Sequence, residues 1–101
     1  MKTRLELHEK LKDLLGSDNV YYQPPSNIQM KYPAIRYTKK RISKIVANDA
    51  SYQKNNLYEI IVISKIPDDP VIEKILDLPY SSYDNSYKAD NLNHDVISLY
   101  Y

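Results

Sequence analysis

The fold is decided by a stretch at the centre of the sequence, Leu57-Tyr58-Glu59-Ile60-Ile61-Val62-Ile63-Ser64-Lys65-Ile66. Successive side chains of an extended chain point to opposite faces. Both faces are apolar here, Leu57, Ile61 and Ile63 on one and Tyr58, Ile60 and Val62 on the other. Strands that are apolar on both sides are typical of the middle of a sheet. We therefore expect residues 57–66 to form a central strand.

Upstream of this strand the pattern predicts one helix and two strands. Thr3 and Glu6 have the spacing of a capping box, and leucines then recur on one helical face until Gly16, which is suited to a left-handed stop. This predicts a helix over residues 3–15. Residues 19–23 and 34–46 read as strands, separated by a proline-bounded loop. Residues 48–56 are expected to hold the turn before the central strand.

Downstream, Asp69-Pro70 is a helix start, with aspartate as the N-cap and proline at the first helical position. Pro79 ends this short helix, and residues 80–88 and 92–101 read as two further strands. The element order is therefore α-β-β-β-α-β-β. The sequence predicts an α+β fold with a mixed, mainly antiparallel sheet of about five strands and two helices packed on it. Residues 1–101 are expected to form a single domain.

Composition limits the function classes. The chain has 101 residues, a formal net charge of +1, no cysteine and one glycine. This excludes thiolate chemistry and glycine-rich phosphate loops, and it lacks the basic excess of a dedicated nucleic-acid binder. The N-terminal segment is too charged for a signal peptide, and no apolar run reaches the length of a membrane span. We expect a cytoplasmic protein without a membrane contact.

No catalytic centre, cofactor site or metal site is expected. The only histidines are His8, at the edge of the leucine stripe, and His94, beside Asp95. Strand alternation sends Asp95 to the opposite face from His94, so the two make a poor acid–base pair. The pair Asp68-Asp69 is explained by helix capping. The sequence therefore favours binding or assembly over catalysis.

The one local run of charge is Lys39-Lys40-Arg41 with Lys44. Strand alternation predicts Lys39 and Arg41 on one face and Lys40 and Lys44 on the other. One interpretation is a solvated edge strand that its lysines protect from wrong pairing. The other is a contact with phosphate or with an acidic partner, and Asp84 and Asp90 are acidic candidates for such a contact.

Two segments carry a family resemblance. They are Asn19-Val20-Tyr21-Tyr22-Gln23-Pro24-Pro25 leading to Met30-Lys31-Tyr32-Pro33-Ala34-Ile35, and Leu78-Pro79-Tyr80-Ser81-Ser82-Tyr83-Asp84 with Ala89-Asp90-Asn91-Leu92-Asn93-His94-Asp95. The chain resembles the small tail-completion proteins of long-tailed bacteriophages, also called tail terminators or head–tail joining proteins. The resemblance spans residues 19–101.

The resemblance implies a virion structural protein. Such subunits form a ring, expected to be a hexamer, that caps the head-proximal end of the tail tube and joins it to the head. The implied partners are the tail tube protein and the neck or connector proteins, with passing contact to phage DNA. The implied locations are the host cytoplasm during assembly and the tail–neck junction of the virion. Two alternatives stay open: a neck or head–tail connector protein, and a small monomeric adaptor that binds a protein or nucleic acid.

Overall fold

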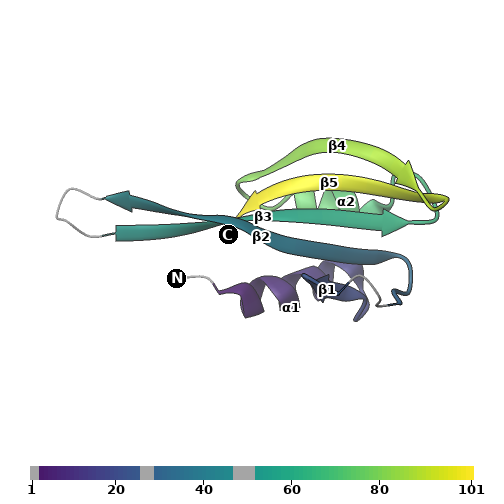
Figure 1. Cartoon of the computed structure of the whole chain (residues 1–101), viewed down its shortest axis with the longest axis horizontal. Coiled ribbons are helices and arrows are strands. Elements are labelled where there is room, and N and C mark those ends of the chain that lie inside the picture. Colours follow the sequence, from purple (N-terminus) through teal and green to yellow (C-terminus); the bar gives the residue numbers. More distant parts are fainter. Residues whose placement is uncertain (1–2, 26–28, 47–51) are drawn as a thin grey trace.

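The computed structural model describes residues 3–25, 29–46 and 52–101, and describes 43–46 and 52–55 by their backbone alone. Two helices and five strands follow one another in the order α-β-β-β-α-β-β, which confirms the predicted α+β fold (Figure 1). Their bounds are α1 Arg4–Leu15, β1 Val20–Tyr22, β2 Ala34–Val46, β3 Tyr52–Ser64, α2 Pro70–Leu76, β4 Ser81–Ala89 and β5 Leu92–Tyr100.

The strands form a single sheet in the order β1-β2-β3-β5-β4. The short β1 runs parallel to β2, and all the other pairs are antiparallel. β3 lies between β2 and β5, as its two apolar faces predict. Ile61 illustrates the register, since it is opposite Arg36 on β2 and Val96 on β5.

Both helices begin where their capping residues predict. The Thr3 side chain accepts a hydrogen bond from the Glu6 N–H, and Gly16 ends α1 in the left-handed region at φ 78°. Asp69 accepts from the Val71 N–H at the start of α2, where Pro70 is the first helical residue. These local signals fix the helix ends because each satisfies backbone groups that the helix itself leaves unpaired.

The main core lies between the sheet and the two helices. Leu7 and Leu11 of α1 and Ile75 of α2 are fully buried against the face of β3 that carries Tyr58 and Ile60. Leu5 lies off the leucine stripe and is 66% exposed. Both helices therefore cover the same face of the sheet.

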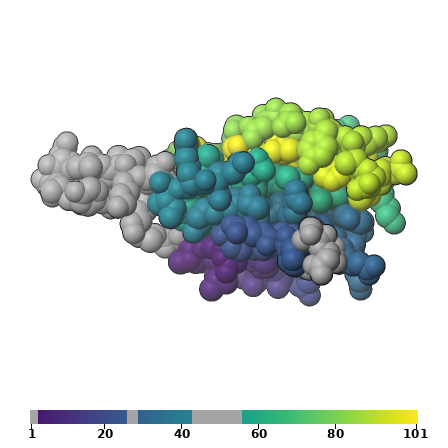
Figure 2. Space-filling model, viewed as in Figure 1, coloured from purple at the N-terminus to yellow at the C-terminus, as the bar shows by residue number. Residues whose placement is uncertain are grey.

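The opposite face of the sheet carries no helix among the described residues. Figure 2 shows β2, β3, β5 and β4 side by side at the surface of this view, with α1 along its lower edge. A small apolar cluster of Ile61, Ile63 and Val96 lies on this open face, and Met30 and Leu92 pack against it.

The prediction of a turn over residues 48–56 is wrong for residues 52–56, which belong to β3. The central strand was predicted to end at Ile66, but β3 ends two residues earlier, at Ser64. β3 begins at Tyr52, so five register pairs from Ile42↔Asn56 to Val46↔Tyr52 continue the β2–β3 hairpin past the end of β5. We call these residues, 42–46 and 52–56, the arm. Residues 48–51 of the predicted turn lie outside the described part of the chain. The arm extends one end of the molecule, which measures 51 Å along its long axis (Figure 1).

The β4–β5 hairpin closes the opposite end. Asp90 and Asn91 connect its strands with φ values of 53° and 62°. Positive φ at both central residues is the geometry of the tight turns that match the twist of two antiparallel strands, and aspartate and asparagine tolerate it better than most residues. Asp90 is exposed at this turn.

We expect Ile61→Ala to lower the free energy of unfolding by about 2–5 kcal/mol, because it removes most of a side chain that is only 6% exposed. Urea unfolding followed by circular dichroism measures this change. The control is Leu5→Ala on exposed helix surface, which should cost less than about 0.5 kcal/mol. A cost below about 1 kcal/mol for Ile61→Ala would mean that the open face contributes little to folding.

Candidate functional site

The arm is the part of the described sheet in which only two strands, β2 and β3, pair with each other. β1 pairs with β2 only up to Tyr37, and β5 pairs with β3 only from Leu57 onward. The last contact between the end of β5 and this part of β3 is the hydrogen bond of 3.0 Å from the Tyr101 N–H to the Asn56 carbonyl. Beyond it, in the described part of the chain, both outer edges of the arm lack a neighbouring strand. A two-stranded hairpin with no third strand is marginally stable in water, and free edges invite pairing with another chain. The arm spans about 17 Å, given the rise of a strand.

Three of the predicted cations, Lys39, Lys40 and Arg41, lie at the base of the arm. A β-bulge there changes the face of the sheet on which Arg41 lies. The register shifts between Lys39 and Arg41, so Lys39 is opposite Tyr58 while Arg41 is opposite Leu57. Arg41 therefore shares the open face with Lys40, which corrects the alternation predicted from the sequence. The extra residue of a bulge reverses the order of faces beyond it.

Each of these cations has a partner within the chain. The Lys39 ammonium lies 6.0 Å from the centre of the Tyr58 ring, and Lys40 Nζ lies 3.5 Å from a carboxylate oxygen of Glu59. Arg41 donates a hydrogen bond of 2.8 Å to the hydroxyl of Tyr100. These contacts are exposed or partly exposed, so each contributes little to folding.

The structure does not bring the predicted cations and acids together within one copy. Asp84 accepts a hydrogen bond from Ser98 on the open face, and Asp90 lies at the β4–β5 turn. β3 and β5 separate them from β2. Lys44 lies in the arm and is described by its backbone alone. A contact between these two groups therefore requires two copies of the chain.

Charge is divided between the two sides of the sheet. Residues 19–48 contain six Lys or Arg and no Asp or Glu; the cations are Lys31, Arg36, Lys39, Lys40, Arg41 and Lys44. Residues 67–101 contain two lysines and seven acids; the acids are Asp68, Asp69, Glu73, Asp77, Asp84, Asp90 and Asp95. The first segment forms β1 and β2 at one side of the sheet, and the second forms α2, β4 and β5 at the other. The near-zero net charge conceals this division.

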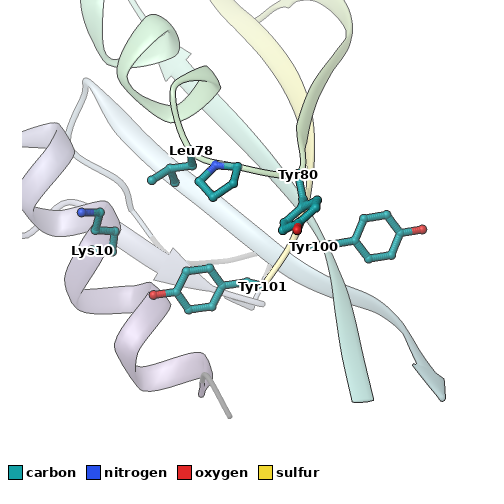
Figure 3. A pocket seen from close by; sticks show the side chains of 6 residues that line it. Lys10, Leu78, Tyr80, Tyr100 and Tyr101 are labelled. Atoms are coloured by element: carbon teal, nitrogen blue, oxygen red, sulfur yellow. The ribbon is translucent and has the colours of Figure 1, made fainter. Parts of the chain in front are cut away.

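A tyrosine pocket of about 250 Å³ lies near the base of the arm (Figure 3). Its lining residues are Lys10, Leu78, Pro79, Tyr80, Tyr100 and Tyr101. Tyr80 is 80% exposed and has a φ of 63°, and its carbonyl accepts a hydrogen bond from the Tyr100 N–H. Figure 3 shows the Tyr101 ring directed toward α1 and the Tyr100 ring on the other side of the strand. Large rings with polar tips are common anchors of protein interfaces.

A second pocket, of about 300 Å³, lies at the opposite end of the β4–β5 hairpin. We call it the β4–β5 pocket, and its lining residues are Pro67, Asp68, Tyr83, Ser86, Tyr87, Lys88, Asn93 and Asp95. Asp95 is only 8% exposed and accepts a hydrogen bond of 2.6 Å from the Tyr83 hydroxyl. This bond raises the pKa of Tyr83, because the carboxylate stabilises the protonated hydroxyl.

Sequence reasoning missed a polar network beneath α1. The Nδ1 atom of His8 lies 2.7 Å from the hydroxyl of the buried Tyr37, and Arg4 donates to the same hydroxyl at 3.5 Å. The guanidinium of Arg4 also lies 4.2 Å from the centre of the Tyr22 ring. The position of His8 at the stripe's edge indicated boundary packing, but its partner on β2 lies 29 residues away and had no local signal.

This network gives a pH prediction. Burial lowers the pKa of His8, and the positive charges of Lys12 and Arg4 lower it further. A lowered pKa in the folded state means that folding favours neutral His8, so its contribution is complete above about pH 6.5, the ordinary histidine value. We expect the free energy of unfolding to fall as pH decreases from 7 through the lowered pKa of His8.

Urea unfolding at pH 5.0, 6.0 and 7.0 measures this effect against the variant His8→Gln. The variant should lose part of the pH dependence, because glutamine does not titrate. Equal slopes for the two proteins would show that His8 is not the responsible group.

The remaining features to consider are the pair His94 and Asp95, groups of metal-binding side chains and apolar helices. His94 stacks on Tyr87 at 4.7 Å between ring centres, whereas Asp95 pairs with Tyr83, so the two neighbours act on different faces as predicted. Across the described ranges, no group of three His, Cys, Asp or Glu side chains is placed to hold a metal ion. No helix in those ranges has the length and apolar character needed to cross a membrane.

The chain was compared with models of known protein families and with curated proteins, and neither comparison returned a match.

Proposed function

We propose that this protein is an assembly subunit that binds copies of itself in a ring at the head-proximal end of a phage tail and joins the tail to the head. The observation that carries the proposal is the arm. It projects beyond the five-stranded part of the sheet, and its residues 43–46 and 52–55 have no strand beside their outer edges in the described chain. Strand pairs of this kind become stable when another chain covers them.

The division of charge supports association in a head-to-tail manner. A basic side on β2 and an acidic side on α2, β4 and β5 are different surfaces of one molecule, so contact between them is heterologous. Heterologous contacts form rings when the rotation between copies closes. The location at a tail end rests on the resemblance of residues 19–101 to tail-completion proteins, and the ring expected there is hexameric.

Localisation on assembly intermediates tests the proposal. Tails are purified from a phage whose heads cannot form, and heads from one whose tails cannot form, and each is probed with an antibody against the chain. We expect the chain at one end of the free tails. Its presence on free heads would favour a neck or connector protein. Absence from both particles would contradict the structural role and favour a monomeric adaptor.

A further inference from the structure

We propose that the arm of one copy docks at the β4–β5 pocket of the next copy, where the exposed acids Asp68 and Asp90 complement its positive charge. This inference rests on the proposed self-association and names the contact that produces it. The arm and the turn between β4 and β5 lie at opposite ends of the long axis (Figure 1), and the β4–β5 pocket is lined by residues near that turn, so an arm cannot reach the pocket of its own copy. Each copy therefore offers one arm and one pocket, which is the arrangement a closed ring needs.

The arm carries positive charge, which favours an acidic partner. The register places Lys44 directly opposite Lys54. Like charges at opposite positions destabilise a strand pair, and a nearby acidic surface relieves this cost. Lys40 and Arg41 add positive charge at the base of the arm. Of the two pockets, only the β4–β5 pocket has acids in its lining, the exposed Asp68 and the buried Asp95, against one lysine, Lys88. The exposed Asp90 lies two residues beyond Lys88 and adds negative charge beside it.

The tyrosine pocket is excluded as the arm's docking site by the same reasoning. Its single charged lining residue is Lys10, and Arg41 bonds to Tyr100 at its rim. Both charges repel a basic arm. The β4–β5 pocket also offers two tyrosines, and tyrosine is among the residues that anchor interfaces most often.

The edge of β4 favours a side-chain contact with the arm over a continuous sheet between copies. β4 is the edge strand on the acidic side, but its register shifts between Tyr83 and Asn85, and Lys88 lies near its end. A bulge and a lysine on an edge strand both oppose pairing with a further strand. We therefore expect the arm to lie against the pocket without extending the ladder of β4.

The experiment uses two forms of the chain in one solution. The observed form is labelled with ¹⁵N and has residues 43–55 replaced by Asn-Gly, a common two-residue turn, so that it can receive an arm but not offer one. The unlabelled form is the full chain. On titration we expect the amide signals of Asp68, Ser86 and Asn93 to shift in a saturable manner, while those of α1 stay in place.

Charge variants test the specificity. Asp68→Lys in the labelled form should weaken binding about tenfold, through the loss of one attraction and the gain of one repulsion. Asp13→Lys, the same change on the exposed surface of α1, should leave binding unchanged. Shifts that map to the tyrosine pocket or to another surface, or no shifts at all, overturn this docking site. None of these outcomes decides whether the protein acts at the tail end, because the localisation on free tails and free heads tests that role separately.

Discussion

Under the proposed function, we expect a chain in which Asn-Gly replaces residues 43–55 to fold but not to join heads to tails. Residues 43–46 and 52–55 pair only with each other in the described register, so their removal leaves the five-stranded sheet and both helices intact. If the arm carries the main contact between copies, its loss removes at least one interface hot spot. Such a loss weakens association by about 30-fold or more per contact. Supplied in trans to a phage that lacks the gene, the shortened chain should give separate heads and tails.

The control for this experiment is the folded state of the shortened chain. Its thermal midpoint should lie within about 5 °C of the full chain, since a change of 1 kcal/mol shifts a domain of this size by about 4–8 °C. Joined particles counted by electron microscopy give the functional result. Normal numbers of joined particles with the shortened chain would show that the arm is dispensable, and the proposal would lose its main support.

Removal of the basic run has the second largest expected effect. We expect the variant with Lys39, Lys40, Arg41 and Lys44 all changed to glutamine to stay folded, because the pairs it loses are exposed or partly exposed and worth about 0–1 kcal/mol each. Joined particles should nevertheless fall about tenfold, because several rim charges together steer two copies into the correct orientation. The complementation assay and the thermal midpoint are measured on the same variant.

Two comparisons make this prediction specific. Glutamine at Lys12, Lys65 and Lys74, three lysines outside β2, should leave joining unchanged. Normal joining but altered DNA passage in the β2 variant would place the run in the lumen of a ring, where positive charge meets phosphate. Normal joining and normal DNA passage would mean that the run is only a solvated edge strand.

Patterns of local chemistry predicted the elements of this fold. The two apolar faces of residues 57–63 indicated the central strand, and Thr3, Gly16 and Asp69 marked helix ends that the structure reproduces. The β2 half of the arm lies in the predicted strand 34–46, but the β3 half was missed because Tyr52 to Asn56 is polar and lacks the alternation of a half-buried strand. Strand pairing there depends on the partner segment in β2, which periodicity within one segment does not report.

The candidate site was only partly accessible from sequence. The basic run was visible as a run, but the bulge that moves Arg41 to the face of Lys40 depends on pairing with β3. The two pockets combine residues from segments far apart in the chain; Lys10 and Tyr101, for example, line the same pocket. Asp95 was considered only as a partner of His94, whereas the structure pairs it with Tyr83 across the hairpin. Such cross-strand contacts can be inferred only once the register of the strands is known.

The central claim is that copies of this chain form a closed ring through their arms at the end of a tail. Cryo-electron microscopy of purified tails tests it most directly, because it counts the copies at the head-proximal end and traces each arm. The account predicts a closed ring, hexameric by the resemblance, in which every arm lies over the β4–β5 end of the adjacent copy. A tail end that carries a single copy, or a ring whose arms point away from the adjacent copies, would contradict it.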